Sequence, residues 1–139
     1  MQTNVIEKKR PTIGFILDWV GGRYQSHVWS GALAAAEERN ANLIVFSGRS
    51  LRAPQGYLSQ SNALFEVINS ENLNGLVILS GTISNYVSQD EFREFVHRYQ
   101  PLPIISISIE LEGIPSVLID NQAGMRAVVK HFVETHGYR

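Results

Sequence analysis

The feature that most constrains the fold is a regular alternation of short apolar runs with amphipathic helical segments. Residues 11–18, PTIGFILD, form a nearly continuous apolar run ending in an acid, which is typical of a strand buried on both faces of a parallel sheet. Further strands are predicted at 42–47, 76–79, 104–109 and 117–119, and helices at 24–40, 59–70, 88–99 and 122–135. This order implies parallel βαβ units. We therefore expect an α/β fold, a three-layer doubly wound parallel sheet of about five strands with helices on both faces.

The predicted helices carry local signals for their ends and for the face that they bury. Ser88 and Glu91 form an S-x-x-E capping box before the third helix, and Gly137 is expected to end the last one. An exit loop is expected at 80–82, directly after the third strand. Isoleucine alternates with serine at 104–109, which predicts one face less buried than in the first and third strands. The side chains expected to face the core from the second and last helices are Leu64, Phe65, Ile68, Met125, Val128, Val129, Phe132 and Val133.

Length and composition limit the chain to one ordinary globular domain. The 139 residues are placed in a domain at 11–139, preceded by a disordered or flexible segment at 1–10. The net charge is −1 and basic residues do not cluster, so we expect no direct contact with nucleic acid. The absence of cysteine excludes disulfides and thiolate metal sites. No run in the sequence suits a signal peptide or a membrane span, so we expect no membrane partner and a cytoplasmic location.

The candidate ligand-binding residues follow from the expected topology. In an open parallel sheet, ligands bind beyond the carboxyl ends of the strands, near the point where the strand order reverses. The side chains at these positions mix aromatic rings, hydroxyls, arginines and a carboxylate, which suits a polyhydroxylated or otherwise polar small molecule. The candidates are Trp19, Arg23, Tyr24, Ser47, Arg49, Ser80, Thr82 and Asp120.

Several of these candidates have a structural interpretation beside the functional one. Trp19 and Tyr24 fit stacking against a ligand and covering of the sheet edge equally well. Arg49, like Arg52, also fits a solvated loop charge. Asp120 fits a cap for the following helix as well as a contact to a ligand hydroxyl.

Other kinds of chemistry find little support in the sequence. Gly21 and Gly22 fit a tight turn and lack the spacing of a phosphate-binding loop. No nucleophile stands beside an obvious base, and Asp18 is alone after the first strand, unlike the acidic cluster of a phosphoacceptor. We therefore expect a protein that is not an enzyme and that uses no cofactor or metal. The histidines without metal-ligand spacing are His27, His97, His131 and His136.

Five segments together resemble the effector domain of LacI/GalR-type regulators, which has a periplasmic-binding-protein-like fold of type I. They are PTIGFILD, GALAAAEERNANLIVF, LNGLVILS, LPIISI and VLIDN, and the last continues to an HGYR ending, similar to the family's V-x-x-D-N-x-x-G and H-G-x-R motifs. INSENLNGLVILSGT and YQPLPIISI also look like the sensor modules of bacterial signalling proteins such as histidine kinases or diguanylate cyclases. The resemblance covers residues 10–139 and implies the first, N-terminal lobe of a two-lobed sensor.

The resemblance implies a small-molecule sensing module of a bacterial transcriptional regulator or signal-transduction protein, whose effector is sugar-like or a polar metabolite. The family's first-lobe contacts would fall at 19–24, 47–49, 80–82 and Asp120. Repressors of the family carry a DNA-binding headpiece before the first strand, but only ten residues precede it here, so DNA binding is not carried over. The second lobe is also expected to be missing, and an uncovered lobe face favours self-association. The alternative is therefore a dimerisation or interaction module with a vestigial cleft.

Overall fold

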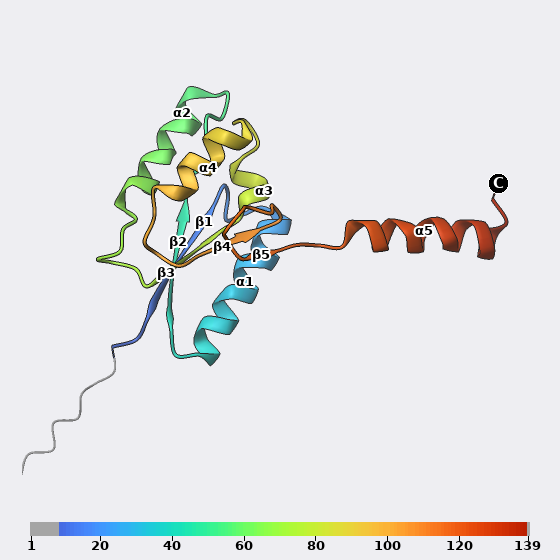
Figure 1. Cartoon of the computed structure of the whole chain (residues 1–139), viewed down its shortest axis with the longest axis horizontal. Helices are drawn as coiled ribbons and strands as arrows, with labels where there is room; N and C mark the ends of the chain where they lie inside the picture. The colour runs from blue at the N-terminus through green and yellow to red at the C-terminus, as the bar shows by residue number, and fades with distance from the viewer. Residues whose placement is uncertain (1–8, 139) are drawn as a thin grey trace, which may run out of the picture.

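The computed structural model describes residues 9–138, which form a parallel sheet of five strands flanked by helices (Figure 1). The three-layer α/β fold expected from the sequence is thereby confirmed. Of the segment expected to be flexible, 1–10, only Lys9 and Arg10 lie within the described residues. The strands are β1 (Thr12–Leu17), β2 (Asn42–Ser47), β3 (Gly75–Ile78), β4 (Ile104–Ile107) and β5 (Ser116–Val117). The helices are α1 (Arg23–Glu38), α2 (Gly56–Ser59), the 3₁₀ helix η1 (Gln60–Val67), α3 (Ser80–Ile83), α4 (Gln89–His97) and α5 (Asn121–His136).

The strand order is β2-β1-β3-β4-β5, and every pairing is parallel. β1 lies between β2 and β3, with Ile13 aligned to Leu43 on one side and to Gly75 on the other. The chain therefore moves to one side of β1 when it forms β2 and to the other side when it forms β3, β4 and β5. This places the reversal of strand order, and with it the expected ligand crevice, at the carboxyl end of β1.

Each face of the sheet has its own apolar core. On one face, α1 covers Phe15, Leu17 and Leu79, which are fully buried. On the other face, η1 and α4 pack aromatic rings over the sheet, and the centroids of Phe65 and Phe95 lie 5.7 Å apart in an edge-to-face arrangement. The apolar side chains of α4 and of the residues that follow it belong to this core; they are Phe92, Phe95, Val96 and Tyr99.

The two ends of α4 are fixed by polar contacts. At the start, the predicted capping box is present, because Ser88 Oγ accepts from the Glu91 N–H at 3.2 Å and Glu91 Oε2 accepts from the Ser88 N–H at 3.0 Å. The backbone hydrogen bond from Ser88 lowers the pKa of Glu91. After the helix, the Tyr99 hydroxyl donates to the Phe65 carbonyl at 3.2 Å and accepts from Arg98 at 2.7 Å. Burial raises the pKa of Tyr99 to about 12.

Two expectations about the middle of the chain are wrong. Leu64 is 47% exposed, whereas Phe65 and Ile68 are buried. The reason is that residues 60–67 form a 3₁₀ helix, in which positions three apart share a face and their neighbours turn away. The expected exit loop at 80–82 is instead the first part of α3, a short helix anchored by the fully buried Ile83.

β4 has one face less buried than β1 and β3, as its alternating sequence predicts, and this face carries isoleucine. Ile104 and Ser106 point into the core with η1 and α4, and Ser106 is fully buried. Ile105 points to the opposite face and is 41% exposed. The Ser106 hydroxyl tolerates burial because it is hydrogen-bonded to Ser80, at 2.7 Å between the oxygens. Ile105 is exposed because α1 does not cover its part of the sheet.

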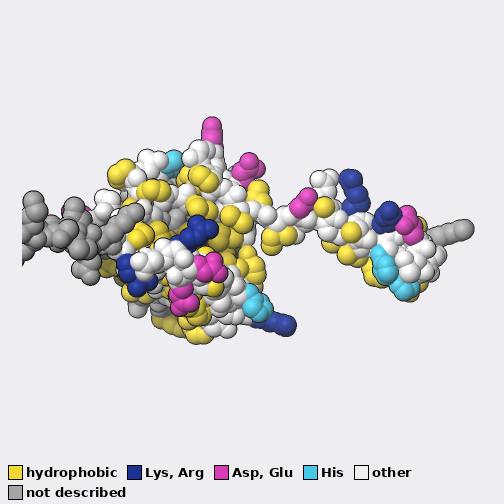
Figure 2. All heavy atoms as spheres, turned by 90° about the horizontal axis from the view of Figure 1, so that it is seen from below, with side chains coloured by type: hydrophobic (Ala, Val, Ile, Leu, Met, Phe, Trp, Pro, Cys, Tyr) yellow, Lys and Arg dark blue, Asp and Glu magenta, His cyan; other side chains and the backbone are white. Residues whose placement is uncertain are grey.

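α5 does not contribute to the core, and this corrects the expectation for the last helix. Its limits agree with the sequence, and Gly137 ends it with the left-handed φ of 65°. However, residues 118–120 lead the helix away from the sheet, as the narrow connection in Figures 1 and 2 shows. The side chains expected in the core are exposed by 46% to 61%: Met125, Val128, Val129, Phe132 and Val133.

None of the helices between Lys9 and Tyr138 is long and apolar enough to cross a bilayer.

Candidate functional site

The carboxyl edge of the sheet, formed by the ends of β1 to β4 and the residues that follow them, gathers most of the predicted site residues. Asp18, directly after β1, is the central member. Its carboxylate accepts from Gln25 Nε2 at 3.1 Å through each oxygen. Its carbonyl accepts from the Arg49 N–H at 3.0 Å and from Ser47 Oγ at 3.5 Å. One residue thus joins the exit of β1 to the first turn of α1 and to the exit of β2.

Trp19 and Arg49 form the second contact between the exits of β1 and β2. The Arg49 guanidinium carbon lies 3.9 Å from the centroid of a Trp19 ring, a cation–π geometry. Arg49 has a left-handed φ of 64°, which is uncommon outside glycine, and Asn62 supports this turn by donating to the Gly48 carbonyl at 2.7 Å. Gly21 lies under the indole, where an added Cβ would be 2.8 Å from Trp19 Nε1. Trp19 is nevertheless 45% exposed, so part of its ring faces solvent.

Tyr24 connects α1 to the exit of β4. Its hydroxyl lies 3.0 Å from Ser108 Oγ, within hydrogen-bonding distance, and the side chain is 41% exposed. Gly81, in α3 after β3, packs against the same serine, since an added Cβ would be 2.9 Å from Ser108 Cβ. The segments that follow β1, β3 and β4 therefore meet around Ser108.

The predicted hydroxyl-bearing residues after β3 are turned toward the protein. Ser80 is fully buried and bonded to Ser106, which in turn donates to the Ile109 carbonyl. Thr82 Oγ1 donates to the Leu79 carbonyl at 3.2 Å, and its side chain is half-buried. Both side chains support the floor of the carboxyl edge in this structure.

The remaining two predicted residues lie at helix starts. Arg23 is the first residue of α1 and is exposed. Asp120 precedes α5, and its Oδ1 accepts from the Ala123 N–H at 2.8 Å, so the structure confirms the capping interpretation of Asp120. The structure thus brings Trp19, Tyr24, Ser47 and Arg49 to the carboxyl edge and uses Asp120 to start α5.

Two supporting residues at this edge do not stand out in the sequence. Gln25 holds the carboxylate of Asp18, and its position three residues after Gly22, in the first turn of a predicted helix, is the signal that could have found it. Asn62 reaches the carbonyls of Gly48, Arg49 and Ser50 from η1. Nothing local to Asn62 indicates that role, because it depends on how η1 folds over β2.

Outside the carboxyl edge, a second hollow of the surface has its arginines in ion pairs. A groove of about 370 Å³ between η1 and α4 includes Arg52 and Arg98 in its wall, and these are ion-paired to Glu91 at 2.6 Å and to Glu66 at 3.0 Å. Within residues 9–138, no three His, Asp or Glu side chains come together as metal ligands.

The chemistry offered by the carboxyl edge is that of a binding surface. The exposed part of Trp19 provides apolar surface, the Arg49 guanidinium lies over its ring, and the Asp18 carboxylate is held by Gln25 at the same edge. Such groups hold a polar molecule by stacking and by forked hydrogen bonds.

The sequence matches no family model, and no curated protein and no solved structure shows significant similarity to it.

Proposed function

We propose that this chain is a small-molecule sensing module of a bacterial transcriptional regulator or signal-transduction protein, working in the cytoplasm. Its ligand, a sugar-like or other polar metabolite, binds at the carboxyl edge of the sheet. The observation that carries the proposal is the joining of Asp18, Trp19 and Arg49 where β1 and β2 end. This is the point at which the strand order reverses, where ligands of open parallel sheets bind.

The groups at this edge are held in place before any ligand arrives. Asp18 is fixed by Gln25, and Arg49 is fixed by its backbone bond to Asp18 and by the ring of Trp19. A ligand that meets oriented groups loses less affinity to the ordering of side chains. The resemblance to LacI/GalR-type effector domains points in the same direction. Signalling follows if the ligand binds one conformation of the module better than another.

Isothermal titration calorimetry tests the proposal with monosaccharides and related polar metabolites. The variant Arg49→Gln removes the charge at the edge, and Arg52→Gln is the matched control, since both arginines have a positive φ in the same loop. A hydrogen bond to a charged group contributes about 1.5–3 kcal/mol, so we expect Arg49→Gln to weaken binding by roughly ten- to a hundredfold. Arg52→Gln should leave affinity unchanged. No binding across the panel, or equal losses in the two variants, would contradict a ligand site at this edge.

A second candidate is a self-association module, which the uncovered apolar side of α5 favours. Five large apolar side chains on one helix are about half exposed, and such surfaces mark sites of protein association. Sedimentation equilibrium separates this candidate from the first, because it reports association without any ligand.

A further inference from the structure

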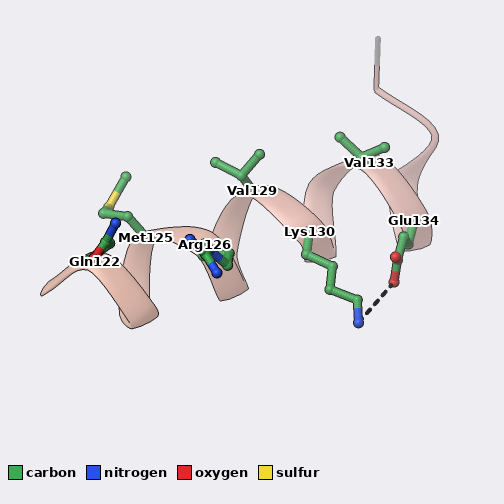
Figure 3. A pocket seen from close by; sticks show the side chains of 7 residues that line it. All are labelled: Gln122, Met125, Arg126, Val129, Lys130, Val133 and Glu134. Atoms are coloured by element: carbon green, nitrogen blue, oxygen red, sulfur yellow. Dashed lines mark ion pairs between the residues drawn. The ribbon is translucent and has the colours of Figure 1, made fainter. Parts of the chain in front are cut away.

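Within residues 9–138, one uncovered apolar surface lies on α5. Met125, Val129 and Val133 project from the same side of the helix, with Arg126 and Lys130 directed elsewhere (Figure 3). Val128 and Phe132 extend this side at helical spacing. We call these five apolar residues the α5 stripe.

α5 needs a partner to be a stable helix. It has 16 residues, and isolated helices of that length are marginal in water. Gly124 and three valines lower its intrinsic propensity further. Its one internal ion pair, Lys130–Glu134 at 3.9 Å, is exposed and contributes little. Packing of the α5 stripe against another surface is therefore the main source of stability open to it.

The second uncovered surface is the half of the sheet beside α1. Val77, Ile105, Ile107 and Val117 point to the α1 face, because they occupy aligned positions on β3, β4 and β5. Ile105 is 41% and Val117 is 59% exposed, whereas Val77 and Ile107 are partly buried at the edge of the core beneath α1. We call these four residues the bare sheet half. On this face α1 covers β1 and β2 but not β4 and β5.

The two surfaces match in character and length. Both are apolar, and the α5 stripe runs roughly 12 Å along the helix axis from Met125 to Val133. β4, with four residues, is roughly 13 Å long. A helix laid on this half of the sheet would complete the layer that α1 begins, as expected for a doubly wound fold.

We propose that α5 of one copy of this chain packs on the bare sheet half of a second copy, and that the exchange is reciprocal. In the described backbone, residues 118–120 direct α5 away from its own sheet, so a second copy meets it without any change in the chain, whereas the chain's own sheet does not. A two-fold axis makes the contact twice, which doubles the area buried by one helix, and specific dimers typically bury about 1,200–2,000 Å² in total. Exchange of an identical element is a low-cost route to such a dimer.

Cross-linking between different copies tests the proposal directly, because the chain has no cysteine of its own. One protein carries Val117→Cys, an isotope-labelled second carries Val129→Cys, and the two are refolded together and treated with a short thiol-specific cross-linker. We expect a labelled–unlabelled dimer as the main product. The control replaces Val129→Cys with Ala127→Cys, on the opposite side of α5, and should give at least tenfold less product. Equal yields from both pairings would overturn the proposal, as would a purely intramolecular product in the double variant Val117→Cys/Val129→Cys.

Sedimentation equilibrium provides a second measurement. Val129→Glu places a charge in the contact and should raise the dissociation constant of the dimer at least tenfold, whereas Ala127→Glu should not change it. Both positions are exposed on α5, so neither substitution disturbs the sheet, and circular dichroism checks this. A parent chain that stays monomeric at every concentration refutes the exchange. Because neither experiment contains a metabolite, failure of the exchange and failure of ligand binding are separate results.

Discussion

The buried hydroxyls of Ser80 and Ser106 offer the sharpest test of how the floor of the carboxyl edge is held together. Both side chains are fully buried, and their oxygens are 2.7 Å apart. Ser106 donates its proton to the Ile109 carbonyl, so it must accept from Ser80. The result is a relay from Ser80 through Ser106 to Ile109, linking the end of β3 to the end of β4.

The two single alanine variants should differ in cost. Ser80→Ala removes one donor and leaves the bond from Ser106 to Ile109 intact, so we expect a loss of about 1 kcal/mol in the free energy of unfolding. Ser106→Ala removes two bonds and leaves the buried Ser80 hydroxyl with a longer contact of 3.3 Å to the Ile78 carbonyl. That variant should lose about 2 kcal/mol. The double variant leaves no stranded hydroxyl, so it should lose about 2 rather than 3 kcal/mol, a coupling of about 1 kcal/mol.

Urea unfolding followed by circular dichroism measures the free energies of this double-mutant cycle, provided that the slope of the unfolding free energy against urea concentration is the same in all variants. The control cycle pairs Ser80→Ala with Ser88→Ala, which shares no hydrogen-bond partner with Ser80 and should add within about 0.5 kcal/mol. If Ser80→Ala and Ser106→Ala add as independently as the control pair, the relay is not a unit and the reasoning fails.

Four further predictions concern single positions. Gly48→Ala places a Cβ 2.4 Å from a buried phenyl ring of η1 and should cost about 1–3 kcal/mol in urea unfolding, whereas Gly31→Ala, with open space in α1, should stabilise by about 0.5–1 kcal/mol. The pKa of Tyr99 is raised to about 12, so its contribution to the free energy of unfolding is complete below its ordinary pKa of 10.0 and falls as pH rises toward 12. An ultraviolet titration should show one tyrosine that ionises last, and Tyr99→Phe should remove that step. Ser88→Ala should cost about 1 kcal/mol through loss of the α4 cap, and an unchanged unfolding midpoint would contradict it. Because the pKa of Glu91 is lowered, its stabilisation is present above pH 4.5 and should decline as pH falls below that value; Glu91→Gln should flatten this decline in unfolding experiments.

The elements that the sequence predicts well are those whose signals lie in neighbouring residues. The capping box of Ser88 and Glu91, the end of α5 at Gly137 and the buried run of β1 each depend on a few consecutive positions. Their geometry is decided by local hydrogen bonds and by burial on both faces. Tertiary context did not override these signals.

The incorrect predictions share a different cause. An amphipathic pattern shows which face of an element is apolar, but it does not show which other element buries that face. The α5 stripe reads as core from spacing alone, yet the helix leaves its own sheet. The alternation at 104–109 indicates one less buried face but not which one, and Ser106 is on the buried face because Ser80, distant in sequence, satisfies its hydroxyl. Leu64 turns outward because the segment adopts a 3₁₀ helix rather than an α-helix.

The candidate site shows the same division. Topology alone indicates that residues after β1 and β2 meet at the carboxyl edge, and the structure places Trp19 beside Arg49 there. The topology gives no side-chain directions, so it does not distinguish the outward Trp19 from the buried Ser80. The supporting bonds from Asn62 depend on how η1 folds over β2 and could not be read from spacing, whereas the place of Gln25 in the first turn of a predicted helix is a local signal.

The extended link at 118–120 divides the chain into parts that open independently. α5 shares no core with the sheet, so its backbone amides exchange with solvent deuterium whenever the helix frays, without unfolding of the body. Amides of β1 and β3, at the centre of the sheet, exchange only when the whole domain opens. If a second copy binds the helix, mass action slows exchange along α5 as concentration rises and leaves β1 unaffected. The rate of deuterium uptake by α5 then measures the extent of self-association.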